Sequence, residues 1–263
     1  MESFAKYLLT SEKLKNRVFI SNPPSAAILI WTNKDILPKI TGVSIVEMEY
    51  TNYNSGVKIE LVTDIFKKKL GTITPFKHII YNKELAYFYI NGERIGISDA
   101  ANIISNDFNI KLGASPAKVP NDIKQIIDPF HIWSRNAFDG FSVMKTDIDI
   151  LSLNDELSEI KSLVEIKRSK KIPVGKWRPF VNPNSRYNDC NNYYLMMELS
   201  DLLNANFFTI HHDIMDDNTL FNGPEQVDLF TYCPSPNKVK NQALLDDFAS
   251  EKNRRIVEVQ SFL

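Results

Sequence analysis

Apolar and polar residues alternate over short stretches of the first hundred residues, a period typical of β-strands. The pattern predicts strands at residues 25–31, 45–50, 57–62, 78–81 and 85–90. Asn91 and Gly92 follow the last of these, and this dipeptide is typical of a tight hairpin turn. Ser98 or Asp99 could cap a helix that runs to about residue 106. The first part of the chain is therefore expected to be a strand-rich α+β domain.

The pattern changes after residues 111–120, whose small residues and prolines are typical of a linker. The segments beyond it predict a helix at 121–130, strands at 132–138, 141–153 and 162–167, a helix at 188–204 and a buried strand at 206–211. The order is helix, three strands, helix, strand. We therefore expect one domain over residues 1–112 and a second over residues 120–263.

Composition is that of an ordinary globular protein. The chain has 263 residues, of which 43% are hydrophobic and 24% charged. Its apolar stretches are too short to span a bilayer, and its first residues are unlike a secretion signal. The only cysteines, Cys190 and Cys233, lack the spacing of a zinc site and are too few for a disulfide framework. We expect a cytoplasmic protein with no membrane partner.

Acidic and basic side chains fall on two of the predicted strands. Asp147 and Asp149 occupy odd positions of the strand 141–153 and so share a face. Glu165 and Lys167 share a face of the next strand in the same way. Adjacent strands lie about 5 Å apart, so carboxylates on them could hold one Mg²⁺ ion. An ammonium beside that ion could orient an attacking water or stabilise charge on a phosphate.

A Glu-x-Lys triplet has little specificity, and the chain holds a second one at Glu159, Ile160 and Lys161. That copy lies where a turn is expected, with no apolar strand leading into it, whereas Leu163 and Val164 precede Glu165. From spacing alone, a second interpretation stays open: the charged residues form a solvated hairpin face, paired across strands.

A basic segment follows the triplet directly. The formal net charge of −1 gives no global positive field, so a nucleic-acid enzyme would need such a local strip. The residues expected to contact nucleic acid are Arg168, Lys170, Lys171, Lys176, Trp177 and Arg178. Lysine and arginine neutralise phosphates, while Trp177 could stack on a base or pack the loop. A solvated lysine-rich loop is the alternative.

Residues 146–151 together with residues 163–169 resemble the core of the PD-(D/E)xK nuclease superfamily, the restriction-endonuclease-like fold, over about residues 121–213. The resemblance implies an αβββαβ core on a mixed sheet. It also implies that Asp149, Glu165 and Lys167 are catalytic, and that the metal is held by Asp149, Glu165 and the backbone carbonyl of Ile166. The proline that gives the family its name is absent before both candidate aspartates, which leaves Asp147 as an alternative metal ligand.

The function implied is that of an Mg²⁺- or Mn²⁺-dependent endonuclease that hydrolyses DNA, in a restriction or defence setting. Such enzymes often act as symmetric dimers that cut both strands, so a homodimer is one expected assembly. The same core also serves nucleases of repair, recombination and mobile elements. A non-enzymatic alternative is a nucleic-acid-binding module with an inert acidic face. The N-terminal domain is expected to recognise nucleic acid or a partner, although no motif in it identifies either.

Overall fold

The chain is described by a computed structural model, which covers residues 8–51, 56–119, 126–169, 172–186, 188–213, 226–258, 261 and 263. It divides into two compact units. Unit 1 comprises Met1–Ile20, Gly56–Ile59 and Asp149–Leu263, and unit 2 comprises Ser21–Ser55 and Glu60–Ile148. Each unit contains one six-stranded mixed sheet, so the fold is mixed α/β.

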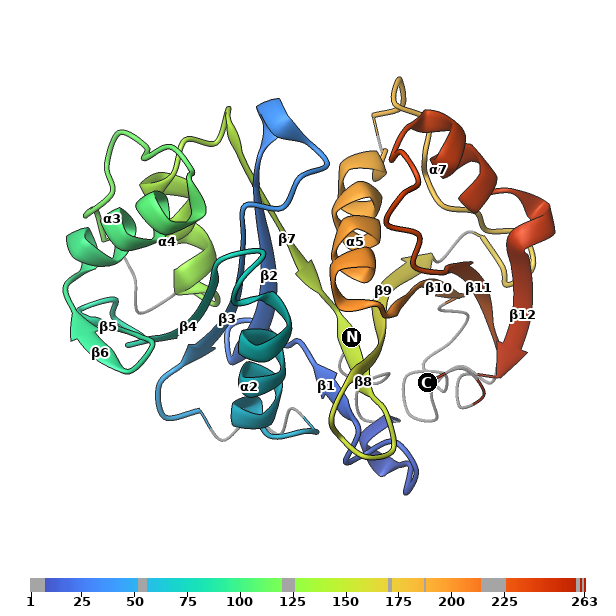
Figure 1. Cartoon of the computed structure of the whole chain (residues 1–263), viewed down its shortest axis with the longest axis horizontal. Helices are drawn as coiled ribbons and strands as arrows, with labels where there is room; N and C mark the ends of the chain where they lie inside the picture. The colour runs from blue at the N-terminus through green and yellow to red at the C-terminus, as the bar shows by residue number, and fades with distance from the viewer. Residues whose placement is uncertain are drawn as a thin grey trace. The chain divides into compact units, whose positions relative to one another are not determined.

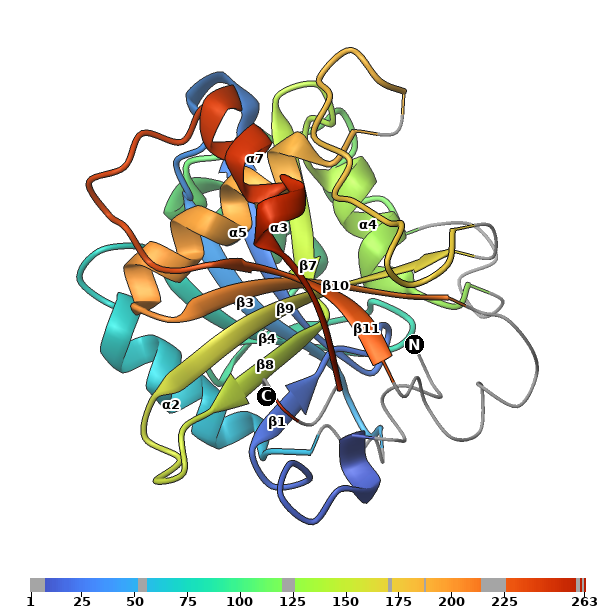
Figure 2. The ribbon, with the colours of Figure 1, turned by 90° about the vertical axis from the view of Figure 1, so that its right-hand side faces the viewer.

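The sheet of unit 1 has the strand order β1-β8-β9-β10-β11-β12 (Figures 1 and 2). Its strands are β1 (Val18–Ile20), β8 (Ile150–Leu153), β9 (Ile160–Ser169), β10 (Asn206–Asp213), β11 (Gln226–Tyr232) and β12 (Arg254–Glu258). β9 runs antiparallel to β8 and parallel to β10, and the remaining neighbours are antiparallel. The parallel pair needs a crossover, which helix α5 (Cys190–Leu203) provides.

Both faces of this sheet are covered. On one face, Tyr193 of α5 and Phe248 of α7 (Gln242–Phe248) contact each other and the ring of Phe207 on β10. On the other face, Leu8 and Leu14 join a buried cluster with side chains of β1, β8, β9, β10 and β11. The 3-10 turn η3 (Glu251–Asn253) leads from α7 into β12. Side chains on the α5 face of β9 are therefore shielded from water except at the strand's end.

The sheet of unit 2 has the order β6-β5-β4-β3-β2-β7. Its strands are β2 (Ala26–Asn33), β3 (Gly42–Met48), β4 (Phe76–Tyr81), β5 (Phe88–Ile90), β6 (Glu93–Ile95) and β7 (Val143–Ile148). β3 and β4 are parallel and are connected through α2 (Ile59–Leu70), while the other pairs are antiparallel. The short 3-10 turn η1 (Lys34–Ile36) follows β2.

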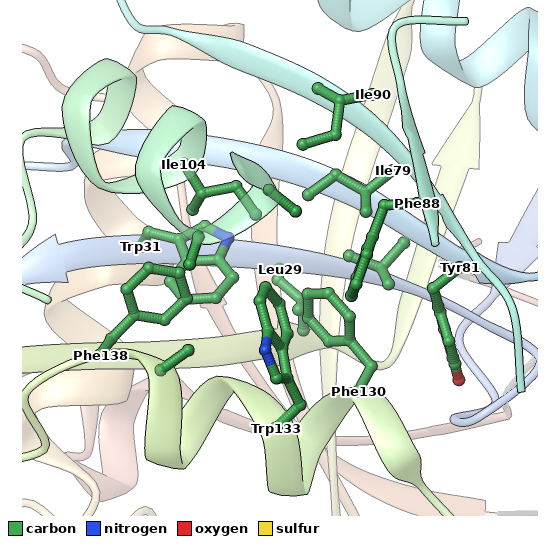
Figure 3. Close-up of a cluster of buried hydrophobic side chains, with 14 of the residues drawn as sticks. Leu29, Trp31, Ile79, Tyr81, Phe88, Ile90, Ile104, Phe130, Trp133 and Phe138 are labelled. Atoms are coloured by element: carbon green, nitrogen blue, oxygen red, sulfur yellow. The ribbon is translucent and has the colours of Figure 1, made fainter. Parts of the chain in front are cut away.

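Helices α3 (Ile97–Phe108) and α4 (Pro129–Ala137) pack on one face of this sheet. Figure 3 shows Phe130 and Trp133 of α4 directed toward Leu29 and Trp31 of β2. The rings of Trp31 and Phe130 lie 6.5 Å apart, edge to face. On the opposite face, Phe66 of α2 stacks on Phe76 of β4 at 5.6 Å. Aromatic burial of this kind supplies most of the stabilisation of such a core.

Several expected elements are confirmed. The strands predicted at 25–31, 78–81, 162–167 and 206–211 correspond to β2, β4, β9 and β10. The helices predicted to begin near residues 98 and 188 correspond to α3 and α5. Asn91 and Gly92 both have positive φ, 51° and 91°, as the predicted hairpin turn requires. Within the described part of the chain, no helix combines the length and the apolar character needed to cross a membrane.

Two predicted strands are helices instead. The apolar positions that suggested a strand at 57–62 continue through Ile65 and Phe66 at helical spacing, and α2 buries them on one side. The strand predicted at 132–138 belongs to α4. Asp128 caps this helix by accepting a hydrogen bond from the His131 amide at 2.9 Å, and Pro129 starts it rather than breaking it. Of the helix predicted at 121–130, residues 121–125 lie outside the described residues, residues 126–128 are not helical, and Pro129 and Phe130 begin α4.

The long strand predicted at 141–153 is interrupted at Asp149. β7 pairs with β2 in unit 2, whereas β8 pairs with β1 and β9 in unit 1. The three expected strands therefore do not form one sheet, and β1 from the N-terminal segment supplies the missing neighbour of β8. The boundaries between the compact units fall between residues 20 and 21 and between residues 148 and 149, and not within the linker expected at 111–120. The reason is that α4 and β7 pack on the N-terminal sheet.

Gly42 at the start of β3 gives a test of the unit 2 core. A Cβ at this position would overlap the ring of Phe108, the fully buried last residue of α3. We expect Gly42→Ala to lower the free energy of unfolding by about 1–3 kcal/mol, because the packed ring has no free space to move into. Urea denaturation measures the change. Gly140→Ala is the matched control, since nothing lies within 4 Å of its Cβ position; equal effects of the two substitutions would contradict the packing argument.

Candidate functional site

Asp149 lies at the point where the chain leaves β7 and enters β8. Its side chain is buried, with 8% of the residue exposed, and its Oδ2 accepts a hydrogen bond of 2.6 Å from the backbone N–H of Ile166. Ile166 is the middle residue of the predicted triplet. The structure therefore places the Asp149 carboxylate against the backbone between Glu165 and Lys167.

Glu165 and Lys167 project from the same face of β9, toward α5. The Lys167 ammonium lies 2.8 Å from Glu165 Oε1 and 3.1 Å from Asp189 Oδ2. All three side chains are largely buried, with 12–22% of each exposed. The ring of Tyr193, one turn into α5, lies 5.9 Å below the ammonium. One cation is thus held between two carboxylates on the shielded face of the sheet.

The charge of Lys167 follows from this arrangement. Burial disfavours the ammonium, but attraction and hydrogen bonds from Glu165 and Asp189 outweigh that effect and raise the pKa of Lys167. The pKa of the Tyr193 hydroxyl is also raised, first by burial and then by the same two carboxylates. At neutral pH the cluster therefore holds a protonated lysine and a neutral tyrosine.

The alternative ligand Asp147 lies elsewhere. It belongs to β7, opposite Leu29 of β2, and so it is part of unit 2. The expectation that Asp147 and Asp149 share a strand face is wrong, because the strand ends between them. Of the two aspartates, Asp149 is the one bonded to the triplet.

The second Glu-x-Lys triplet has a different environment. Glu159 and Lys161 flank the first residue of β9 and are exposed. The ammonium of Lys161 donates to the backbone oxygen of Leu263 at 2.7 Å. This pair lies at the opposite end of β9 from Lys167 and offers a natural internal control.

The basic segment is split between exposed and buried side chains. Arg168 and Lys176 are exposed, and exposed Arg178 pairs with Glu251, its Nε lying 2.8 Å from Oε1. Lys170 and Lys171 lie outside the described residues. An exposed ion pair contributes little stability, so Arg178 can exchange Glu251 for another anion.

Trp177 packs the loop rather than presenting a surface for a base. It is 1% exposed and stacks on the ring of His211 at 5.0 Å and 9°. His211 Nδ1 lies 3.2 Å from Asp228 Oδ2, and Asp228 Oδ1 accepts from the Gly175 amide at 2.8 Å. These contacts attach the segment that follows β9 to the end of the sheet.

The donor set of the site suits a hard cation. Asp149, Glu165 and the Ile166 carbonyl offer oxygen ligands, and magnesium typically uses one or two carboxylates and keeps several waters. No cluster of three or more His, Cys, Asp or Glu side chains fit to hold a metal occurs among the described residues.

Sequence reasoning missed Asp189 as a site residue. Asp189 stands at the N-cap of α5, where an aspartate is common for capping alone. Its side chain makes no capping hydrogen bond and instead reaches Lys167. Asp189 follows Lys167 by 22 positions, so no local pattern connects them.

The hydrogen bond from Ile166 to Asp149 can be tested directly. Asp149→Ala leaves this amide without its acceptor, so we expect the free energy of unfolding to fall by about 1–3 kcal/mol. Asp149→Asn keeps an acceptor oxygen of the same shape and should lose less than half as much. Urea denaturation at neutral pH measures both. Equal losses would show that the charge, and not the hydrogen bond, is what matters at this position.

No protein family, curated protein or solved structure matches this chain.

Proposed function

We propose that this chain is a metal-dependent endonuclease that hydrolyses phosphodiester bonds in DNA. The observation that carries the proposal is the hydrogen bond that joins Asp149 to the segment of β9 that bears Glu165 and Lys167. The antiparallel pair β8–β9, the parallel pair β9–β10 and the crossover helix α5 support a restriction-endonuclease-like core in unit 1. In that core, β1 takes the place of the strand expected from residues 132–138.

Asp149, Glu165 and the Ile166 carbonyl are the ligands we propose for Mg²⁺ or Mn²⁺. Such an ion, when bound, supplies a water of lowered pKa and neutralises charge on the scissile phosphate. The hydrogen bond from the Ile166 amide fixes the Asp149 carboxylate, so little ordering of that side chain is needed when a ligand arrives.

Lys167 acts in this proposal as a fixed positive charge. Because Glu165 and Asp189 raise its pKa, the ammonium stays protonated at neutral pH and does not serve as a general base. The two carboxylates hold the ammonium in place beside Glu165, the proposed metal ligand, where a phosphate oxygen would arrive. Charge that develops on the phosphate during cleavage is stabilised by such a cation.

Arg168, Lys176 and Arg178 are the exposed cations that support nucleic acid as the substrate. They follow Lys167 directly in sequence, and the buried Trp177 between them anchors the segment. Contact with phosphates is sequence-independent, so these residues would position the strand rather than select a site. A restriction or defence role and a homodimeric assembly belong to the same proposal.

A plasmid-cleavage assay tests the proposal. Supercoiled DNA is incubated with the full chain and Mg²⁺, and in parallel with Mn²⁺ or EDTA. We expect nicking or linearisation that requires the divalent ion. Asp149→Asn, Glu165→Gln and Lys167→Met should each lower the rate by about a hundredfold or more, since each removes a charge at the reacting phosphate.

Glu159→Gln and Lys161→Met are matched controls, because they make the same chemical changes in the second Glu-x-Lys triplet. Their rates should equal that of the parent. Cleavage that survives Glu165→Gln and Lys167→Met would overturn the assignment of the site. Retention of DNA in a gel-shift assay without cleavage under any of the ions would instead favour the binding module with an inert acidic face.

A further inference from the structure

Unit 2 contains two cavities that share the side chains of His131 and Lys145. The smaller has a volume of about 110 Å³ and the larger about 360 Å³. The described residues lining both belong to Ser21–Ser55 and Glu60–Ile148. His131 lies in the first turn of α4, and Lys145 lies in β7. These two side chains therefore form the boundary between the two cavities.

The larger cavity is cationic. Lys34, His131, Arg135 and Lys145 line it, and no Asp or Glu is among the described residues of its wall. Lys34 and Arg135 are exposed at its rim, whereas Lys145 is partly buried. Lys34 donates to the Gly140 carbonyl at 2.8 Å, which holds its ammonium beside the cavity. A cluster of cationic side chains attracts a multiply charged anion.

Lys145 is the one partly buried cation of this group. Its ammonium donates to Ser134 Oγ at 2.6 Å and lies 5.4 Å from the ring of Phe130. Burial is the main reason that the pKa of Lys145 is lowered to about 8; attraction from Asp128 and Asp147 partly offsets the effect of burial, and repulsion from Arg135 adds to it. The pKa of His131 is lowered as well, by burial first and then by Lys145.

The smaller cavity has a different chemistry. Apolar side chains of Leu29, Val46, Tyr81 and Phe130 form much of its wall, and Figure 3 shows Leu29, Tyr81 and Phe130 on neighbouring elements. Asp128 and Asp147 also line it and offer carboxylate acceptors. The volume of about 110 Å³ is below the ~150 Å³ of a closed cavity that holds benzene, so this open pocket takes at most one six-membered ring and excludes a fused pair.

We propose that the two cavities together bind a pyrimidine nucleotide. The phosphate occupies the larger cavity beside Lys145 and Arg135, and the base occupies the smaller one between Leu29 and Phe130. A carboxylate is a suitable acceptor for the N–H groups on a pyrimidine edge, as in the pairing of Asp or Glu with the amino group of cytosine. This site is independent of the proposed cleavage site, which lies in unit 1.

The pyrimidine nucleotide bound here could be a free nucleotide or one nucleotide of a single-stranded DNA. Isothermal titration calorimetry with the full chain distinguishes them, using 2′-deoxycytidine 5′-monophosphate, deoxycytidine, inorganic phosphate, 2′-deoxyadenosine 5′-monophosphate and oligodeoxycytidylate. We expect the cytidine monophosphate to bind at least tenfold more tightly than the nucleoside, phosphate or the purine nucleotide. Tighter binding of the oligonucleotide per site identifies a strand as the source, and weaker binding identifies the free nucleotide.

Two substitutions test the assignment of residues. Lys145→Met retains the length of the side chain and removes its charge, and Arg135→Gln removes the neighbouring charge. Each should weaken binding of the cytidine monophosphate at least tenfold, whereas Lys68→Gln on the exposed side of α2 should leave it unchanged. Far-ultraviolet circular dichroism and thermal unfolding verify that the variants are folded. Unchanged binding by folded Lys145→Met would overturn the proposal, as would equal affinity for inorganic phosphate.

The pH dependence gives a second readout. A bound dianion favours protonated Lys145, so affinity should be highest below the pKa of about 8 in the free protein and fall as the pH rises through it. The second phosphate proton is already lost near pH 6, so the ligand does not titrate in this range. The charged groups around Lys145 are Lys34, Asp128, His131, Arg135 and Asp147. Lys145→Met should abolish the decline between pH 7 and 9; a decline that persists in it would contradict the assignment.

Discussion

The hydrogen bond from the Ile166 amide to the Asp149 carboxylate is the contact on which the candidate site depends. β8 begins at Ile150, opposite Val164, so it provides no backbone partner for β9 beyond that point. The side chain of Asp149 takes the place of a ladder acceptor at the next position. A part-buried amide would otherwise remain unpaired, at a cost comparable to that of a lost hydrogen bond. The same contact orders a carboxylate beside Glu165 and Lys167 at the end of the strand.

Burial of three charged side chains is expensive unless each is paired, and the site meets this condition with one cation between two carboxylates. Replacing such a group with apolar residues is often neutral or stabilising. The cluster therefore makes a better case for a functional role than for a structural one. Near the C-terminal end of β9, the three side chains keep 12–22% of their surface exposed, while α5 and α7 cover Phe207 of the neighbouring strand.

Local charge differs sharply from global charge in this protein. A net charge of −1 suggests no anionic partner, yet cations concentrate both after β9 and around the larger cavity of unit 2. The cations that follow β9 are mostly exposed and can change partners. Around the larger cavity, Lys145 is partly buried and its pKa is lowered. Desolvation makes the second group more selective, because a partly buried cation gains more from an anion than a solvated one does.

The sequence by itself determined the elements whose patterns are local: the strands β2, β9 and β10, the hairpin at Asn91 and Gly92, and the helices α3 and α5. It also singled out Asp149, Glu165 and Lys167. Only the tertiary structure decided that the chain changes sheets at Asp149, that Asp189 reaches Lys167, and that Trp177 is buried on His211. Those contacts join residues far apart in the chain, and hydrophobic periodicity describes only which face of an element is covered, not which element covers it.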